Sequence, residues 1–542
     1  MKNRAFYLLL LLLPAEALLA QANGSSSNYF IYGILAIAVI VFLGLVMQVS
    51  DNLLAIEAKR TGADETGANF SIFPRLNELF APKAPAYTGD EPVLNLRRGF
   101  DIKLEGEAEK QIDPGFLANT FAVQPGNFVG MLPIPKVEVE VGQTVKAGDS
   151  LFYDKTRPDI KYVAPVSGEV IAVNRGEKRS IKEVVILADK NIQYREIPAF
   201  DLEKGSREEL VKLLIEFGGW SLIRQRPFNV VPDTNEIPRD IFISTFDTAP
   251  LAPDLNFVVE GKGEAFQKGL DVLNKLTEGK VYLGLDARQE QAPSPVFTQA
   301  RGVEKYWFTG KHPAGNVGIQ IHHINPITTK GKVWVLGVQD VITLGALFSE
   351  RRYNAERVIA LTGVELKNPT YVRTYLGANI GELIKENLKN DHVRIISGDV
   401  LSGEKKEATE FLNFHDDQIS VVEEGDYYEM FGWLLPLKPR PSLSWSYPNF
   451  LFPDVKFKAD TNTHGEERAF VVTGQYEAVL PMDIYPQHLF KAILANDFEQ
   501  MEGLGIHELS EEDVALCEFV CTSKQPLQQI LRQGLDVIRE QS

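Results

Sequence analysis

The feature that most constrains this chain is a long uncharged stretch near its N-terminus. No charged residue occurs between Glu16 and Asp51, and residues 29–49 read YFIYGILAIAVIVFLGLVMQV. A helix over these residues, at ~1.5 Å of rise per residue, is about as long as the hydrocarbon layer of a membrane is thick. A buried core helix is the alternative, but helices that are apolar on every side are unusual in small cores. We therefore expect a transmembrane anchor at 23–50, with globular sequence after it.

The segment before the anchor has the pattern of a secretory signal. Residues 1–22 combine a basic start, an apolar run and the small-x-small end Ala20-Gln21-Ala22. Lys59 and Arg60 follow the anchor, and positive charge favours the cytoplasmic side. The pattern predicts a single-pass anchor with the main body on the cytoplasmic face, whether or not the signal-like segment is cleaved.

Charge, cysteine content and length limit the partners, the compartment and the number of domains of the globular body that follows the anchor. The net charge is -17, and no basic stripe offsets it, which argues against a nucleic-acid partner. Only two cysteines occur, Cys517 and Cys521, as expected for a reducing compartment. The chain of 542 residues is long enough for three or four domains.

The first part of the body reads as short β segments. Residues 137–141 alternate, 142–149 form a turn, and 164–168 (APVSG) form another. The pattern resembles the biotinyl/lipoyl-type barrel-sandwich hybrid. Lys155 and Lys161 lack the sequence setting of a modified carrier lysine, so a structural use of the fold is favoured over a covalent carrier.

The middle of the chain has α/β character. A strand is predicted over 240–247, a helix over 264–277 and a second strand over 280–285, an order typical of a parallel sheet. From 357 the sequence RVIALTGVELKNPTYVRTYLGANIGELI resembles a β-grasp ligand-binding module, and the chain becomes helical after 486. We expect a multidomain α/β plus β protein with a linker (51–92), a barrel-sandwich hybrid domain (93–190), a Rossmann-like α/β domain (191–356), a β-grasp soluble ligand-binding module (357–437) and a helical C-terminal domain (438–542).

One cluster of residue types suits a polar ring with an apolar tail, such as a quinone. Arg224 and Arg226 offer paired cations, and Trp220 and Phe228 offer aromatic faces beside them. The same residues equally suit a salt-bridged junction between domains. From the residues alone, the junction is the better interpretation.

Signals for a nucleotide or a metal are weak. The Gly-rich loop 310–318 matches neither a Walker A motif nor G-x-G-x-x-G, so a tight structural loop is expected. His312, His322 and His323 have no carboxylate or cysteine at ligand spacing.

The two cysteines lie four residues apart, on one face of a predicted helix. An iron–sulfur cluster takes four ligands. Buried, inert cysteines are therefore favoured over half of a shared metal site. We predict no catalytic residue and no metal site, with Cys517 and Cys521 as weak metal candidates.

Several collinear stretches together resemble the family of the A-subunit of the Na+-translocating NADH:quinone reductases. They are NFVGMLPIPKVEVEVGQTVKAGDSLFYDK, YVAPVSGEVIAVNRGEKRSIKEVVI, GGWSLIRQRPFNVVP, STFDTAPLAPD, HPAGNVGIQIH, VRIISGDVLSG and LSEEDVALCEFVC. They fall in order over roughly four fifths of the chain. The first 90 or so residues depart from the pattern, because family members begin near the position of Leu94.

The resemblance implies a cytoplasmic-side component of a sodium-pumping respiratory complex in the bacterial inner membrane. Electrons in such a complex pass from NADH to quinone through FAD, FMN and iron–sulfur centres in other subunits, so no redox cofactor is expected in this chain. The membrane-embedded B-subunit is the expected partner. The family's association with quinone makes Asn127, Phe128 and Met131, together with the cluster of Trp220, Arg224, Arg226 and Phe228, quinone-proximal candidates.

Two other function classes stay open at this point. One is an Rnf-type electron-transport subunit that carries its own flavin or cluster, which visible absorbance of the purified protein would reveal. The other is a non-enzymatic ligand-binding or polysaccharide-export component, which predicts a periplasmic body. The sequence does not show which quinone, if any, touches the chain.

Overall fold

The structure is a computed structural model that describes residues 27–61, 84–328, 331–430, 439–443, 448–452 and 454–541. The chain divides into two compact units, Met1–Lys83 and Ala84–Ser542. The signal-like segment 1–22 and residues 62–83 of the expected linker 51–92 lie outside the described residues.

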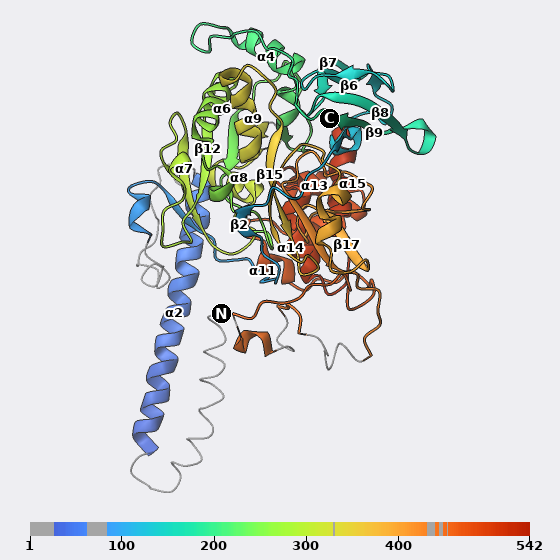
Figure 1. Ribbon diagram of the computed structural model, residues 1–542. Helices are drawn as coiled ribbons and strands as arrows, with labels where there is room; N and C mark the ends of the chain where they lie inside the picture. The colour runs from blue at the N-terminus through green and yellow to red at the C-terminus, as the bar shows by residue number, and fades with distance from the viewer. Residues whose placement is uncertain are drawn as a thin grey trace. The chain divides into compact units, whose positions relative to one another are not determined.

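The first unit contains one described helix, α2 (Ser27–Thr61), which includes most of the expected anchor (Figure 1). Its described side chains are largely exposed, Ile40 and Phe42 among them. None of the helices that the structure describes is both long enough and apolar enough to cross a membrane. The predicted anchor is therefore not confirmed.

The second unit is built around a six-stranded sheet with the order β1-β13-β12-β11-β14-β10. All neighbours are parallel except β10, which runs antiparallel to β14. Every residue of β12 is buried, as expected for a parallel strand covered on both faces. The strands are β1 (Val93–Asn95), β10 (Arg224–Arg226), β11 (Asp240–Ser244), β12 (Val281–Asp286), β13 (Glu304–Thr309) and β14 (Val333–Val335).

Helices cover this sheet, and the predicted α/β domain is confirmed (Figure 1). The helices α6 and α9 approach closely through glycines, because a Cβ atom at Gly269 or Gly345 would overlap a carbonyl oxygen of the other helix. The helices are α4 (Arg207–Glu216), α5 (Leu255–Val258), α6 (Gly263–Leu276), α7 (Pro295–Thr298), α8 (Val317–Ile324) and α9 (Val338–Ser349).

Two small antiparallel sheets form the predicted barrel-sandwich hybrid. Their apolar side chains, such as Leu151, Val170 and Val184, are fully buried between them. One sheet consists of β3 (Thr120–Val123), β9 (Ile181–Ala188), β8 (Gly168–Arg175) and β5 (Thr144–Val145), and the other of β4 (Lys136–Val137), β6 (Ser150–Asp154) and β7 (Arg157–Val163).

A second six-stranded sheet follows, with the order β18-β17-β19-β15-β16-β2. Its edge strand β2 comes from before the barrel-sandwich sheets, just as β1 joins the α/β sheet. The elements are β2 (Glu109–Ile112), β15 (Glu356–Thr362), β16 (Thr370–Tyr375), α10 (Ile380–Ile384), β17 (Val393–Ser397), β18 (Glu404–Lys406) and β19 (Gln418–Glu423).

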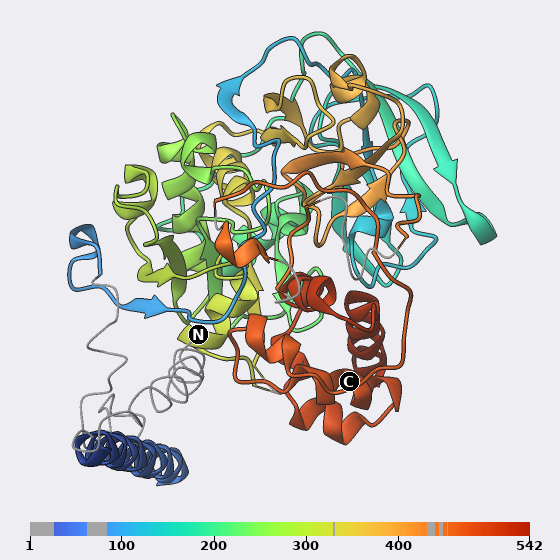
Figure 2. The ribbon, with the colours of Figure 1, turned by 90° about the horizontal axis from the view of Figure 1, so that it is seen from below.

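The chain ends in packed helices, seen in red in Figure 2. Their common core includes Leu489, Phe490, Val514 and Leu531. Ser510 caps α14 through a capping box with Asp513. The helices are α11 (Gln475–Val479), α12 (Pro486–Leu494), α13 (Phe498–Gly503), α14 (Glu511–Val520) and α15 (Leu527–Gln541).

Candidate functional site

The two predicted quinone-proximal stretches lie beside each other. A Cβ atom on Gly130 would lie 3.5 Å from the Val230 side chain and would overlap the guanidinium of Arg539 in α15. Val230 is hydrogen-bonded through its backbone to Gln225 in β10, with a Gln225 N to Val230 O distance of 2.7 Å. The loop after β3 and the turn after β10 therefore share one neighbourhood.

A short 3₁₀ turn, η4 (Pro125–Asn127), positions the first of these stretches. The Asn127 amide donates to Asn413 Oδ1 at 3.0 Å and accepts from the Phe414 N–H at 2.9 Å. Through these hydrogen bonds, Asn127 connects the barrel-sandwich domain to the loop after β18. Met131 is half-buried and packs against the main core.

Phe128 is buried in a cluster of aromatic rings. Its ring centroid lies 4.4 Å from that of Tyr162, 4.9 Å from that of Phe414 and 6.2 Å from that of His415. Rings at these distances add about 0.5–1.5 kcal/mol per pair beyond the area that they bury. The cluster joins two sheets that are far apart in the sequence.

Trp220 does not face this cluster. It is fully buried, it donates from Nε1 to the Pro232 carbonyl at 3.0 Å, and its ring lies 5.2 Å from that of Trp334. Because its one polar side-chain atom is hydrogen-bonded, Trp220 is a core residue of the α/β domain.

The two arginines of β10 reach different partners. Arg226, whose side chain is 3% exposed, donates to Glu512 at 2.8 Å and lies 3.9 Å from Asp513. Arg224 places its positive charge near His415. Arg226 thus forms the salt-bridged junction that was the better interpretation of this cluster.

Phe228 lies on the same side as Arg226. Its backbone is left-handed (φ 81°), its ring meets that of His507 at 6.0 Å, and its carbonyl accepts from Arg532 at 3.0 Å. Phe228 therefore packs against the C-terminal helices rather than against Phe128.

A buried polar centre adjoins the aromatic cluster. Arg357 donates to Asp340 at 2.5 Å, and His415 Nδ1 lies 4.0 Å from the other oxygen of the same carboxylate. Burial raises the pKa of Asp417 to about 6. Sequence reasoning missed this centre, because its members come from α9, β15 and the loop before β19.

His415 is held neutral in this centre. Burial, together with the nearby positive charge of Arg224, lowers the pKa of His415 to about 3. Its Nδ1 atom has no hydrogen-bond partner among the described residues. A neutral imidazole has one nitrogen that donates and one that accepts, so it can form a hydrogen bond with a polar group on a bound ring compound.

We expect His415 to make the protein less stable as the pH falls. The unfolded chain protonates this histidine near its ordinary pKa of 6.5, whereas the folded chain does not do so until about 3. Between about pH 7 and about pH 5, wild type should lose about 2 kcal/mol of unfolding free energy relative to His415→Gln. Urea denaturation of both proteins at each pH measures the difference. Parallel pH profiles would contradict the assignment.

A second polar group lies at the carboxyl ends of β11, β12 and β13, where open α/β sheets commonly bind ligands. The His312 ring contacts Thr248 Oγ1 at 3.1 Å through Nδ1, and the His312 backbone N–H donates to Asp101. Asp247 is an exposed residue, but the surrounding loops desolvate its carboxyl group and, with repulsion from Asp399 and Glu512, raise its pKa to about 6. The loops were visible in the sequence, but their meeting with Asp399 and Glu512 was not.

The three histidines considered as metal ligands have separate partners. His312 contacts Thr248, His322 Nδ1 contacts Glu508 at 2.7 Å, and His323 Nε2 contacts the Pro481 carbonyl at 2.7 Å. Within the part of the chain that the structure describes, no three His, Cys, Asp or Glu side chains gather at a metal-sized site.

Cys517 and Cys521 are both buried and free. The Tyr476 hydroxyl lies 2.8 Å from Cys521 Sγ, and burial raises the pKa of Cys517 well above its ordinary value. A thiol held in this way forms little reactive thiolate.

Thiol labelling tests this directly. Native protein at mildly alkaline pH should react with almost no maleimide, because burial keeps both thiols protonated and inaccessible. Unfolding in guanidinium removes that burial, so both thiols should then be labelled. Mass spectrometry counts the labels. Rapid labelling of the folded protein would contradict the inert assignment.

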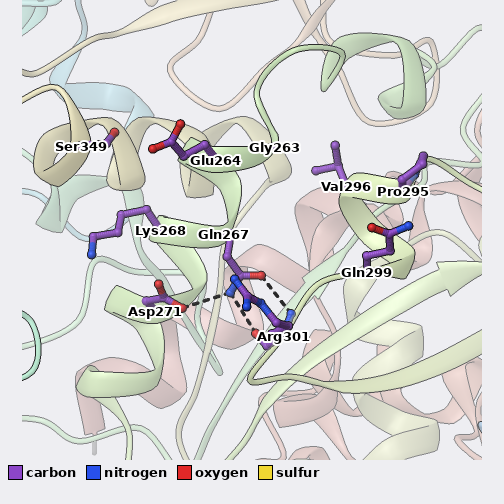
Figure 3. A pocket seen from close by; sticks show the side chains of 10 residues that line it. All are labelled: Gly263, Glu264, Gln267, Lys268, Asp271, Pro295, Val296, Gln299, Arg301 and Ser349. Carbon is purple, nitrogen blue, oxygen red and sulfur yellow. Dashed lines mark hydrogen bonds between the residues drawn. The ribbon is translucent and has the colours of Figure 1, made fainter.

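A cavity of about 770 Å³ lies elsewhere on the α/β domain (Figure 3). It is open and polar, and in its lining the Gln267 amide donates to Asp271 at 3.0 Å and to the Arg301 carbonyl at 3.1 Å. It is lined by Gly263, Glu264, Gln267, Lys268, Asp271, Pro295, Val296, Gln299, Arg301 and Ser349. None of the predicted site residues lines it.

Comparisons with known proteins agree with the order of the domains. Three family models match: the NqrA N-terminal barrel-sandwich hybrid domain over 94–189, the NqrA second alpha/beta domain over 205–353 and the NQRA C-terminal domain over 358–408. One solved structure, an NAD+-reducing [NiFe]-hydrogenase in the air-oxidized state, matches with a TM-score of only 0.33 at 11% identity, over 64% of this chain and 67% of that one. A likeness at that level carries no argument.

Curated relatives match over most of their length. The A-subunit of the Na(+)-translocating NADH-quinone reductase of Alcanivorax borkumensis is 38% identical over 450 residues, which is 82% of this chain and 99% of the relative. The proteins of the same name from Yersinia pestis and Vibrio atlanticus are 38% and 37% identical, each over 83% of this chain and 100% of the relative. The chain therefore belongs to NqrA, the family of the A-subunit of the Na(+)-translocating NADH-quinone reductases.

Proposed function

We propose that this chain works as the NqrA component of a complex that couples electron transfer from NADH to quinone with sodium export. One observation carries the proposal: the chain matches its NqrA relatives over 99–100% of their length, so the whole of each relative has a counterpart here. The Rnf-type and ligand-export alternatives are not favoured by these relatives.

The role that we propose for the chain is positional. NADH, FAD, FMN, iron–sulfur centres and quinone would be handled by the complex, with the redox groups held in other subunits. The dense polar and aromatic contacts between the barrel-sandwich domain, the α/β domain and the second six-stranded sheet suit a rigid organiser of such a complex.

Asn127, Phe128, Met131 and Arg224 form the better of the two quinone-proximal candidates. The Phe128 ring contacts that of His415, Asn127 accepts from the N–H of the preceding residue Phe414, and Arg224 places its positive charge near the same ring, while Met131 follows Phe128 in its loop. The unpaired Nδ1 of His415 can donate to a quinone carbonyl in the neutral tautomer that carries its proton there. Arg226 and Phe228 are already engaged with the C-terminal helices, and Trp220 is fully buried. A photoreactive quinone should therefore label peptides containing Phe128 or Phe414 before those containing Phe228.

We also retain the anchor and the side of the membrane as proposals. Residues 23–50 would hold the body on the cytoplasmic face of the bacterial inner membrane, next to the membrane-embedded B-subunit. The support is the uncharged sequence and the Lys59-Arg60 pair after it. We likewise propose domain boundaries at 93–190, 191–356, 357–437 and 438–542, with a β-grasp module third and a helical domain last.

Affinity purification tests complex membership. The full chain, tagged at its C-terminus and extracted in mild detergent, should bring down the other subunits, including the membrane-embedded one. The matched control is the same tag on an unrelated single-pass membrane protein. Recovery of the chain alone would contradict the proposal.

A further inference from the structure

The hairpin of β8 and β9 projects away from the rest of the barrel-sandwich domain (Figures 1 and 2). Its end is closed by the turn η5 (Glu177–Arg179), with hydrogen bonds from Gly176 N to Ser180 O at 2.9 Å and from Ser180 N to Glu177 O at 3.0 Å. The turn is thus a formed structure with a defined backbone.

The end of this hairpin is basic in a strongly acidic chain. Arg175, Lys178 and Arg179 are all exposed, while the chain as a whole carries a net charge of -17. Among the described residues, neither Lys178 nor Arg179 forms an ion pair, and Arg175 donates only to the Arg179 carbonyl at 3.3 Å. Their charges are therefore available to an external anion.

The backbone at these positions is unusual for long side chains. Lys178 and Arg179 have φ angles of 51° and 65°, consecutive left-handed conformations that hairpin turns normally give to Asn and Gly. A left-handed conformation is unfavourable for residues with a Cβ atom. The geometry of the turn therefore does not explain why both positions carry basic side chains.

Two exposed aliphatic residues lie beside the basic end of the hairpin. The Ile181 N–H donates to the Pro133 carbonyl at 3.0 Å, which fixes the neighbouring residues Leu132 and Ile134 next to the hairpin. These two residues are 41% and 40% exposed. Exposed aliphatic groups next to Lys and Arg are the combination that enters a membrane interface.

We propose that this basic hairpin surface, consisting of Leu132, Ile134, Arg175, Lys178 and Arg179, docks on the anionic lipid headgroups of the membrane surface. The proposal rests on the proposed membrane-bound function. A lipid surface is favoured over an acidic protein because the cations are long, unpaired and accompanied by aliphatic rather than aromatic groups. An otherwise acidic body also needs a basic contact to approach an anionic surface.

The test follows a probe at the end of the hairpin in the full chain. Ser180→Cys is labelled with a fluorophore, since both native cysteines are buried, and the protein is placed in nanodiscs of phosphatidylglycerol mixed with brominated phosphatidylcholine. We expect quenching in these discs and little in discs of brominated phosphatidylcholine alone. Each basic residue near an anionic surface contributes about fivefold to the binding equilibrium constant, so Lys178→Glu with Arg179→Glu should reduce the ratio of quenched to unquenched probe at least fivefold.

A matched control separates this surface from net charge. Lys212→Glu with Lys385→Glu changes the charge by the same amount at two exposed sites that form no ion pair with any described residue, and quenching should persist. Absence of quenching in wild type, or quenching that survives reversal at the hairpin, would overturn the proposal. Loss of partner subunits on reversal, without any quenching in wild type, would assign the surface to an acidic protein instead.

The outcome stays distinct from that of the proposed function. If the chain does not co-elute with nanodiscs, the anchor fails, and the same probe is then read with added vesicles of the anionic mixture at low salt. Complex membership is judged separately, from the subunits that co-purify.

Discussion

Arg357→Met is expected to lower the free energy of unfolding by about 3–5 kcal/mol. The Arg357 side chain is 2% exposed and donates at 2.5 Å to Asp340, which is itself buried. Removing the guanidinium leaves the Asp340 carboxylate in the polar centre without its cation, next to Asp417. Methionine fills much of the same space, so the loss reports the unpaired charge rather than a cavity. Urea denaturation followed by tryptophan fluorescence measures it.

Arg373→Met is the matched control for this change. Arg373 lies opposite Val358 on the neighbouring strand β16, but its side chain is 54% exposed and meets Glu356 only at 3.6 Å. An exposed pair of this kind contributes about 0–1 kcal/mol. Similar losses for the two variants would show that Arg357 holds no special position.

The second large effect is expected at the crossing of α6 and α9. In Gly345→Ala, the new Cβ atom would overlap the Ala265 carbonyl oxygen and lie 2.8 Å from the backbone nitrogen of Gly269. The obstruction is backbone, so the helices have to move apart, and overpacking of this kind costs about 1–3 kcal/mol. We expect a lower midpoint of thermal unfolding, measured by circular dichroism.

Gly503→Ala provides the same substitution without the crowding. Gly503 ends α13 and has open space where its Cβ would lie. Alanine is the better helix former by about 1 kcal/mol, so this variant should be neutral or slightly more stable. Equal destabilisation at both positions would contradict the close packing of α6 on α9.

Local pattern was sufficient for much of the fold. The apolar runs that became β11 and β12, with the amphipathic α6 between them, predicted the parallel sheet because each run is buried on both faces. The turn signals around 142–149 and 164–168 predicted the barrel-sandwich sheets. By contrast, β1 and β2 pair with sheets far along the chain, and no local pattern specifies a partner at that separation.

The candidate site was predictable only in part. Asn127 and Phe128 were singled out by resemblance, and they do lie at a junction of domains. Their partners Phe414 and His415, and the adjoining Asp340–Arg357 pair, come from separate elements that only the tertiary fold brings together. The sequence alone does not distinguish a buried arginine on a strand, such as Arg357, from an exposed one. The pairing of Arg226 with Glu512 likewise depends on how the C-terminal helices pack.

The sodium dependence of NADH oxidation by a complex purified through a tag on this chain tests the role of the chain in the pump most directly. We expect quinone-dependent NADH oxidation that sodium stimulates and that disappears from membranes lacking this chain. Full, sodium-stimulated activity in membranes without the chain would contradict its place in the pump.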